Sequence, residues 1–247
     1  MKSSVLFLTI FISATTLAQT PAKDVHSRQQ AWVAYFNQTR LTKKLGLWMD
    51  IHWRQTDHFF ERPATLIIRP ALSWYIKDNV RFNAGYAYVN FFPAKGLHTS
   101  RPEHRPWQQV AWTTKYTGLN MIQWLRLEER FLHNIANDVL QDGYSLNYRV
   151  RYNLGFTVPL RGKEIVDKTP FAVVMNEVFI SFGRKVVYNT FDQNRFFIGG
   201  GYQFTPQLSA HLGYMNVFQQ EASGNRYAIS HAMRLYVYHN VNLMKKS

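Results

Sequence analysis

Hydrophobic and polar side chains alternate without interruption between Ser145 and Val158. The apolar or aromatic set is Leu146, Tyr148, Val150, Tyr152, Leu154, Phe156 and Val158, and the polar set is Ser145, Asn147, Arg149, Arg151, Asn153, Gly155 and Thr157. Because successive side chains of a β-strand point to opposite faces, this pattern predicts a strand with one apolar face and one cationic, polar face. A tilted strand crosses a bilayer in about 9–11 residues, so this stretch is long enough to span an outer membrane.

The same alternation recurs along the chain, with turn-forming residues between the segments. It predicts strands near 29–40, 45–56, 65–76, 80–92, 104–117, 120–132, 144–158, 171–182, 194–204, 207–219 and 227–240. In the second of these, Leu47, Met49 and Ile51 fall on one face, and Asp50 and His52 fall on the other. The alternation slips around 106–112, which predicts a β-bulge there.

The connections between these segments alternate between short and long. Tight turns are expected at 41–45, 77–79, 117–120 and 205–207, and longer loops at 58–64, 92–103, 133–143, 183–193 and 220–226. Outer-membrane barrels have short periplasmic turns and longer extracellular loops, although the segment 159–170 is longer than this scheme expects. The fold predicted is therefore all-β, a single antiparallel transmembrane β-barrel of 10–12 strands. Because bacterial single-chain barrels have an even strand count, we favour twelve, with residues 20–28 as the additional strand and both chain ends in the periplasm.

The first residues have the three parts of a secretory signal peptide. Lys2 provides the positive start, residues 5–12 the apolar core, and Thr16-Leu17-Ala18 a small-residue cleavage site. We therefore expect a signal peptide at 1–18 and one outer-membrane barrel domain at 19–247. The chain contains no cysteine, which excludes disulfides and lipidation at the cleavage site. After the signal peptide, no apolar run approaches the roughly 18 residues of a transmembrane helix.

The composition supports an exported membrane barrel of a Gram-negative bacterium. Phe, Tyr and Trp make up 16% of the chain, and such residues form girdles at the two interfaces of a membrane barrel. The formal net charge is +14, but the cations lie along strand faces and in turns, without a recognition helix or zinc motif, so we expect no nucleic-acid partner. The partners expected are outer-membrane lipid, the phosphates of lipopolysaccharide, and the barrel-assembly machinery during biogenesis.

Several sequence phrases occur in a characteristic order. They are Arg69-Pro70 before Tyr75, Gly85-Tyr86, Pro102-Glu103-His104-Arg105-Pro106-Trp107-Gln108-Gln109, Arg126-Leu127-Glu128-Glu129-Arg130, Tyr148-Arg149-Val150-Arg151-Tyr152, Glu177, Asn194-Arg195 and Gly213-Tyr214. With these phrases the whole mature chain resembles the domain-of-unknown-function 2490 family of outer-membrane β-barrels. The resemblance implies a bacterial outer-membrane barrel, and it implies no established activity and no catalytic residues.

The polar strand faces are rich in arginine. The residues expected to form a polar network in the lumen are Arg54, Arg69, Glu103, Arg105, Arg126, Glu128, Arg130, Arg149, Arg151, Glu177 and Arg195, and Asp50, Arg81 and Arg234 fall on the same faces. Buried charges without partners are costly, so one interpretation is a set of Arg–carboxylate pairs that fills and rigidifies a narrow barrel. The other is a porin-like cationic passage that admits or binds small anions such as carboxylates or phosphates.

Two other functions remain open. A membrane-embedded barrel enzyme acting on lipid would need a nucleophile beside a histidine, and His104, His211 near Ser209, and His231 near Ser230 are the available histidines. No nucleophile motif and no recognised metal-ligand spacing accompanies them, so the sequence predicts no catalytic residue, metal or cofactor. A soluble periplasmic carrier of the lipocalin type would have the same alternation with an apolar interior.

Overall fold

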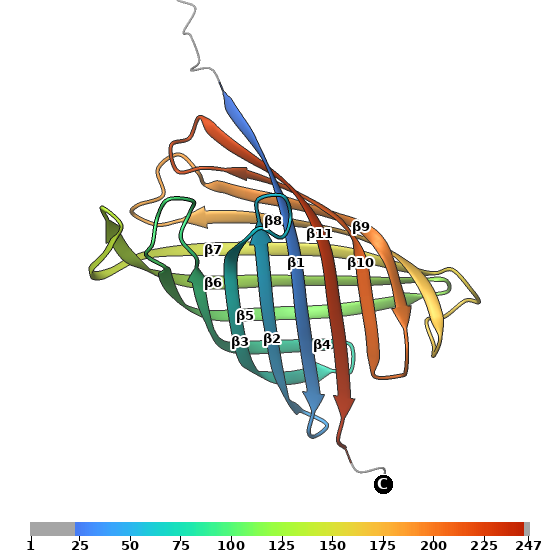
Figure 1. The fold of residues 1–247 in the computed structure, drawn as a ribbon. Coiled ribbons are helices and arrows are strands. Elements are labelled where there is room, and N and C mark those ends of the chain that lie inside the picture. Colours follow the sequence, from blue (N-terminus) through green and yellow to red (C-terminus); the bar gives the residue numbers. More distant parts are fainter. Residues whose placement is uncertain (1–22, 245–247) are drawn as a thin grey trace, which may run out of the picture.

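The computed structural model describes residues 23–244, which form a closed β-barrel in which each strand pairs with its neighbours in chain order (Figure 1). The strands are β1 (Asp24–Arg40), β2 (Leu45–Thr56), β3 (Arg62–Lys77), β4 (Val80–Phe91), β5 (Arg101–Tyr116), β6 (Leu119–Ala136), β7 (Val139–Pro159), β8 (Thr169–Phe182), β9 (Phe191–Gln203), β10 (Leu208–Gln220) and β11 (Arg226–Asn242). Every segment that the alternation predicted is a strand. This part of the chain contains no helix long and apolar enough to cross a membrane, and the expected signal peptide at 1–18 lies outside it.

The prediction of twelve strands is wrong, because the described chain has eleven. Residues 24–28 do not form a strand of their own; they begin β1. Since neighbouring strands otherwise run antiparallel, an odd count makes the first and last strands point the same way, and β1 pairs with β11 in parallel from Asp24–Arg226 to Arg40–Asn242. Figure 1 shows these two strands side by side with their arrows in the same direction. The expectation that both ends lie on one side is therefore also wrong.

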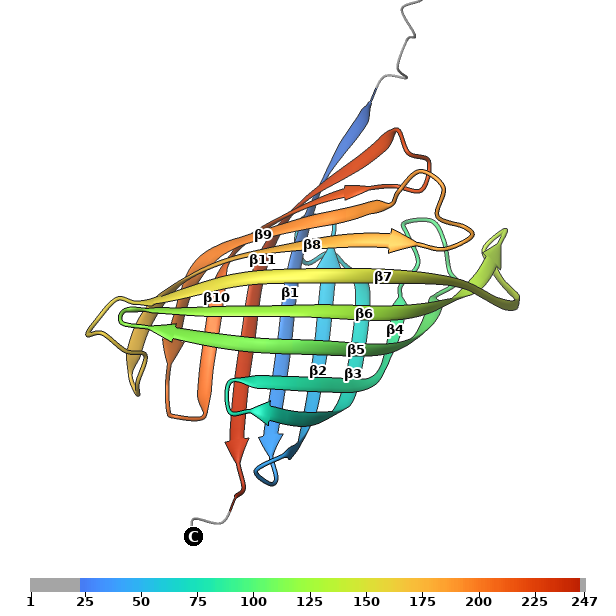
Figure 2. The same ribbon diagram turned by 180° about the vertical axis from the view of Figure 1, so that it is seen from behind.

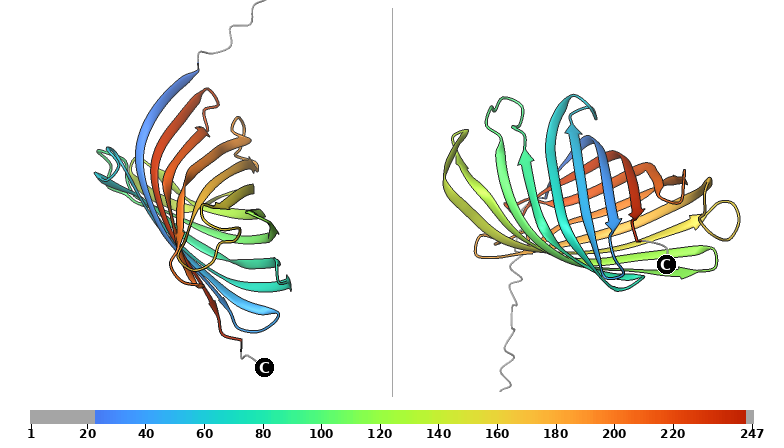
Figure 3. Two further views of the ribbon diagram at one scale, coloured as in Figure 1. Left: turned by 90° about the vertical axis from the view of Figure 1, so that its right-hand side faces the viewer. Right: turned by 90° about the horizontal axis from the view of Figure 1, so that it is seen from below.

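The barrel has two distinct ends. We call the end with the connections 57–61, 92–100, 137–138, 183–190 and 221–225 the loop end, and the end with 41–44, 78–79, 117–118, 160–168 and 204–207 the turn end. β1 starts at the loop end, and β11 finishes at the turn end. In Figures 1 and 2 the strands β5–β7 cross the direction of β1 and β11, and Figure 3 shows the same twist from two further sides. Such crossing follows from the strand tilt that closes a barrel.

One predicted loop turns out to be largely strand. β6 and β7 continue through most of 133–143 and meet at a two-residue turn, Asn137–Asp138, in which both residues have positive φ. The loop predicted at 92–103 is largely confirmed, because it spans 92–100 and only its last three residues belong to β5. The bulge expected at 106–112 is absent, because the pairing of β5 with β4 is continuous and its register with β6 does not shift. The local pattern looks irregular because the apolar Trp107 and Ala111 are buried on the inward face, while the polar Gln108 falls on the outward face.

The two faces of the wall differ as the alternation predicted. On β7 the side chains of Arg149, Arg151 and Asn153 are buried, whereas those of Leu146 and Tyr152 are exposed on the outside. Large apolar side chains remain exposed all around the barrel, with Leu72 on β3 and Leu212 on β10 at 68% and 58% exposure. Most charged residues at the middle of the strands point inward, so the polar interior is the place to look for a functional site.

Candidate functional site

Cross-strand pairing brings the charged residues of β6 and β7 into register. Glu128 lies opposite Arg149, and Arg126 lies opposite Arg151. Because opposite positions of an antiparallel pair share a face, all four side chains point into the interior. The long, flat guanidinium groups then reach across the narrow lumen to carboxylates on other strands.

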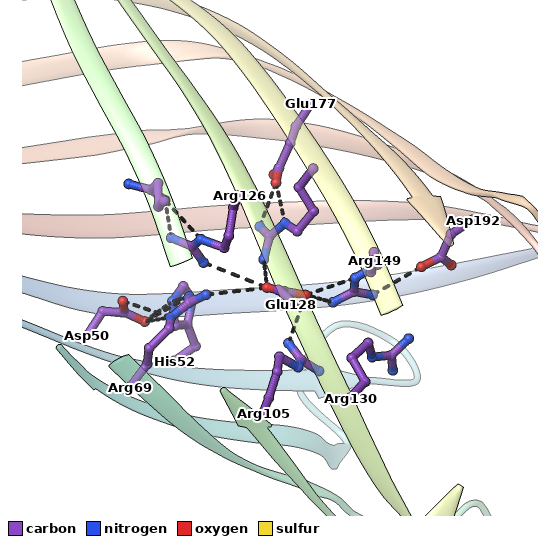
Figure 4. Close-up of polar contacts among 12 residues, drawn as sticks. Asp50, His52, Arg69, Arg105, Arg126, Glu128, Arg130, Arg149, Glu177 and Asp192 are labelled. Atoms are coloured by element: carbon purple, nitrogen blue, oxygen red, sulfur yellow. Dashed lines mark hydrogen bonds and ion pairs between the residues drawn. The ribbon is translucent and has the colours of Figure 1, made fainter. Parts of the chain in front are cut away.

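Glu128 is the hub of this arrangement, with no solvent exposure. Its oxygens accept hydrogen bonds from Arg149 Nη2 and Arg151 Nη1, both at 2.6 Å. Guanidinium groups of Arg69, Arg105 and Arg126 approach it at 3.9, 3.7 and 3.8 Å (Figure 4). Five cations therefore surround one carboxylate, and a single acid cannot balance their charge.

Further carboxylates extend the cluster in several directions. Arg69 bonds Asp50, which also bonds His52 at 2.8 Å; Glu177 binds Arg151; and Asp192 binds Arg149 at 3.0 Å (Figure 4). Glu103 binds Arg105 and Arg130. We call this set the central network: Asp50, His52, Arg69, Glu103, Arg105, Arg126, Glu128, Arg130, Arg149, Arg151, Glu177 and Asp192. Ion pairs link its members from β2 to β9 across the lumen.

The structure brings together most of the residues that the sequence assigned to the lumen. The nine that join the central network are Arg69, Glu103, Arg105, Arg126, Glu128, Arg130, Arg149, Arg151 and Glu177. Arg54 and Arg195 also line the interior cavity, but neither forms an ion pair with any described residue. Sequence reasoning missed Asp192, and it placed Asp50 and His52 on a polar face without assigning them to the network.

Aromatic rings also contact arginines of the central network. The Arg126 guanidinium carbon lies 4.4 Å from the centre of the Trp107 ring, and that of Arg151 lies 4.5 Å from the Phe179 ring. Trp107 and Phe179 are both completely buried. Stacking on an aromatic face satisfies the flat surface of a guanidinium and leaves its N–H groups free at the edge.

A cavity of about 970 Å³ runs beside the central network. Its lining includes Arg28 and Arg62 near the loop end, and Gln203 and Asn240 near the turn end. Away from the mouths, the arginines that line it are Arg54, Arg69, Arg81, Arg105, Arg126, Arg130, Arg149, Arg151, Arg195 and Arg234, whereas the carboxylates of the interior are Asp50, Glu103, Glu128, Glu177 and Asp192. The cavity thus extends toward both ends and has more cations than anions on its wall.

The histidines considered for catalysis are not placed beside a nucleophile. His231 faces outward and bonds the Tyr214 hydroxyl at 2.6 Å, while the neighbouring Ser230 faces the interior. His104 also faces outward and bonds Tyr86. His211 and Ser209 both line the cavity, but the structure shows no hydrogen bond between them, and His211 Nδ1 has no partner within residues 23–244. Over the same residues, no group of three or more acidic or histidine side chains could hold a metal ion.

One loop-end contact depends on an ionised carboxylate. Asp138, in the turn between β6 and β7, accepts hydrogen bonds from the backbone N–H groups of Thr99 and His98 at 3.0 and 2.8 Å. These bonds, that of Thr99 first, hold the pKa of Asp138 below its ordinary value of 3.8. The contact is therefore complete at neutral pH and is lost as the pH falls through the lowered pKa.

We expect Asp138→Asn to release the 92–100 loop at neutral pH. The amide side chain has one acceptor oxygen instead of two, so at least one of the two backbone N–H groups loses its partner. Hydrogen exchange of peptides covering 92–100 should become faster at pH 7, and wild type should match the variant only below pH 3.8. Asp142→Asn, an exposed acid in the same hairpin, is the control. Equal exchange in Asp138→Asn and wild type would contradict the assignment.

A comparison with known protein families identifies the family of this chain. The profile of a protein family of unknown function, DUF2490, matches residues 29–228, which is most of the chain. The chain belongs to the DUF2490 family. This DUF2490 protein is also similar to an uncharacterized protein of Methylorubrum extorquens, with 28% identity over 166 residues. The match covers 64% of this chain and 66% of that relative, just under two thirds of its length. No solved structure matches this DUF2490 chain.

Proposed function

We propose that this DUF2490 protein is an integral outer-membrane β-barrel whose interior is a narrow passage for small anions. The observation that carries the proposal is the distribution of side chains between the two faces of the wall, which is the reverse of that in a water-soluble barrel. Exposed apolar residues such as Leu72, Trp74 and Ile76 cover the outside of the wall, and ionised residues occupy the inside. Water-soluble domains rarely expose apolar surface over so much of their area, whereas a barrel in lipid requires it.

Aromatic residues at the loop end support a membrane setting. The outward-facing His104 has Tyr86, Tyr88 and Tyr144 around it, with ring centres 5.4–6.0 Å apart. Near the turn end, the Tyr35 hydroxyl bonds His239 at 2.8 Å. Aromatic rings with a polar edge suit the two interfaces of a bilayer, where one side of the ring meets lipid and the other meets water. Outer-membrane lipid and lipopolysaccharide are the partners we propose for this surface.

The cavity favours the interpretation of the interior as a passage rather than as a completely filled barrel. It is lined by residues from both ends, and the interior has twice as many arginines as carboxylates along the middle of the strands. A cationic constriction attracts anions and repels cations through the same unbalanced charge. The solutes that fit are small carboxylates, phosphates and inorganic anions, which arginine binds through paired N–H donors.

The alternative of a soluble lipocalin-type carrier requires the opposite arrangement of faces. Such a barrel holds its ligand in an apolar interior and presents polar residues to water. Here Asp50, Glu103 and Glu128 are fully buried inside, while Leu212 and Ile198 are exposed outside. This arrangement favours the membrane barrel.

Reconstitution tests the proposal directly. After export in a Gram-negative host, we expect the protein in the detergent-extracted outer membrane and not in the aqueous periplasmic extract. Purified protein in a planar bilayer should then give a steady conductance whose reversal potential, under a KCl gradient, has the sign of chloride selectivity. The selectivity should fall at high salt because ions screen the arginines.

Three results would overturn parts of this proposal. Recovery of the folded protein in the aqueous extract would contradict membrane insertion. A membrane-inserted barrel without conductance would support a filled, structural barrel in place of a passage. A cation-selective conductance would contradict the role given to the surplus arginines.

A further inference from the structure

The interior has two walls of different chemistry. The central network covers most of one side, on β2, β3 and β5–β7, with Glu177 and Asp192 at its edge on β8 and β9. A larger apolar cluster covers the other side, on β8–β11 and β1, and a smaller one, with Ile67, Ala87, Val89 and Trp107, lies within the first side on β3–β5. The buried members of the larger cluster are Trp32, Ala34, Phe171, Val173, Phe197, Met215, Val217, Ala232 and Tyr236. Most of these residues also line the cavity. A passage for hydrated ions alone does not need such a wall, whereas a site for an organic ligand does.

Three arginines stand where the two walls meet, around Trp32. The guanidinium carbons of Arg54 and Arg195 lie 3.9 and 5.0 Å from the centre of the Trp32 ring. Arg234 is the register partner of Trp32 across the seam between β1 and β11, and Arg54 is its partner on β2. The indole therefore has guanidinium groups from β2 and β9 over its ring, and Arg234 is its neighbour in the sheet on β11.

None of these three arginines has a carboxylate partner within residues 23–244. Arg195 Nε donates to Gln193, and Arg234 contacts the Met175 sulfur and the Tyr238 hydroxyl. The Nε atoms of Arg54 and Arg234 are buried and have no acceptor. This contrasts with the central network, where every arginine forms an ion pair.

An unbalanced group of cations inside the barrel, of which Arg234 is buried and Arg54 and Arg195 are half-buried, is costly unless an anion joins it. Arg54 stacks on the indole face, so its N–H groups are available at the edge of the plane, where an oxyanion can bind. Arg234 lies over Phe197 and Tyr236 in the same way, at 4.0 and 3.9 Å from the ring centres. A ligand whose anionic group meets these donors would place the rest of its structure against Phe171 and Met215 on the apolar wall.

We propose that the lumen holds a binding site for an amphiphilic carboxylate, whose anionic group lies between Arg54, Arg195 and Arg234 and whose apolar body packs on the aromatic wall. This proposal extends the proposed function, because it names the class of anion and the residues that bind it inside the lumen. It rests on the proposed function only for its physiological setting. The site itself depends on the barrel interior, which exists in detergent as well as in a membrane.

Calorimetric titration of the detergent-solubilised protein with 2-naphthoate tests the site. We expect saturable binding, with the neutral analogue 2-naphthylmethanol and the small anion acetate each at least about tenfold weaker, because each lacks one half of the required chemistry. Arg54→Gln and Arg195→Gln should each weaken naphthoate binding by about tenfold or more. Neither variant removes an ion-pair partner, so both should fold.

Arg81→Gln is the matched control. Arg81 lines the same cavity without an ion pair in the described chain, but it lies over Trp48, 5.4 Å from that ring. Its removal lowers the total charge equally and should leave naphthoate affinity within about twofold. Three results would each overturn the proposal: equal loss in Arg81→Gln, unchanged binding in both Arg54→Gln and Arg195→Gln, or acetate binding as tightly as naphthoate.

The same data separate this proposal from the proposed function. Naphthoate binding without any membrane conductance would leave the site in place and reject the passage. Anion-selective conductance without naphthoate binding would reject the site and leave the passage. Where both hold, naphthoate should block the conductance of the wild type and fail to block that of Arg54→Gln at the same concentration.

Discussion

Replacing Glu128 by glutamine is expected to lower the free energy of unfolding by about 3–5 kcal/mol, the cost of removing one partner from a buried ion pair. Glu128 has no solvent exposure and bonds Arg149 and Arg151 at 2.6 Å, with three further guanidinium groups within 4 Å. Glutamine preserves the shape of the side chain but leaves these cations without their shared carboxylate. Urea unfolding of the detergent-solubilised protein, followed by tryptophan fluorescence, measures the change.

Glu129→Gln provides a control at the next position of the same strand. Glu129 lies on the opposite face of β6 and forms no ion pair in the described residues, so its substitution should change the free energy of unfolding by no more than about 0.5 kcal/mol. Similar stability of Glu128→Gln and Glu129→Gln would mean that Glu128 is not the centre of the network. A larger effect of Glu129→Gln than of Glu128→Gln would mean that Glu129, and not Glu128, points into the barrel.

The second large effect is expected at Gly213, which we predict cannot accept even a methyl group without a backbone shift. A Cβ atom there would lie 2.3 Å from the Ile198 carbonyl oxygen and 2.5 Å from the Gly199 Cα atom. Gly199 and Gly213 are register partners on β9 and β10, where the two backbones approach closely. Gly213→Ala should therefore lower the free energy of unfolding by about 1–3 kcal/mol through overpacking.

Gly200→Ala is the comparison for that measurement. A Cβ at Gly200 has its nearest neighbour at 3.9 Å, so the substitution should change stability by no more than about 0.5 kcal/mol. The same urea titration applies to both variants. If Gly213→Ala unfolds at the same urea concentration as Gly200→Ala, the close approach of β9 and β10 does not exist in solution.

The sequence was sufficient to predict the strands and the direction of most side chains. Period-two alternation is a local property, so the inward positions of Glu128, Arg149 and Arg151 could be assigned without a structure. Alternation also separated Asp50 and His52 from Leu47 and Ile51. It does not specify register across the lumen, however, and the contacts of Glu128 with Arg69 and Arg105 depend on register and curvature together.

Asp192 shows why one member of the network could not be predicted. Between Phe179 and Ile180 on β8 the pairing with β9 jumps from Gln193 to Phe191, which leaves Asp192 as the extra residue of a bulge. A bulge re-aims a side chain that strict alternation would misplace. The strand count failed for a different reason. The even number typical of bacterial barrels is a statistical regularity, and no residue of β1 signals that its partner is the parallel β11.

The seam between β1 and β11 also determines the order in which the wall can be completed. All seventeen residues of β1 pair with β11, but only Ala31–Arg40 pair with β2. Residues 24–30 therefore acquire a continuous ladder only when the last strand arrives, after the longest loop closure available to the chain. A nascent barrel would first exist as an open ribbon with two unpaired edges, and truncation of β11 would leave that ribbon unable to close.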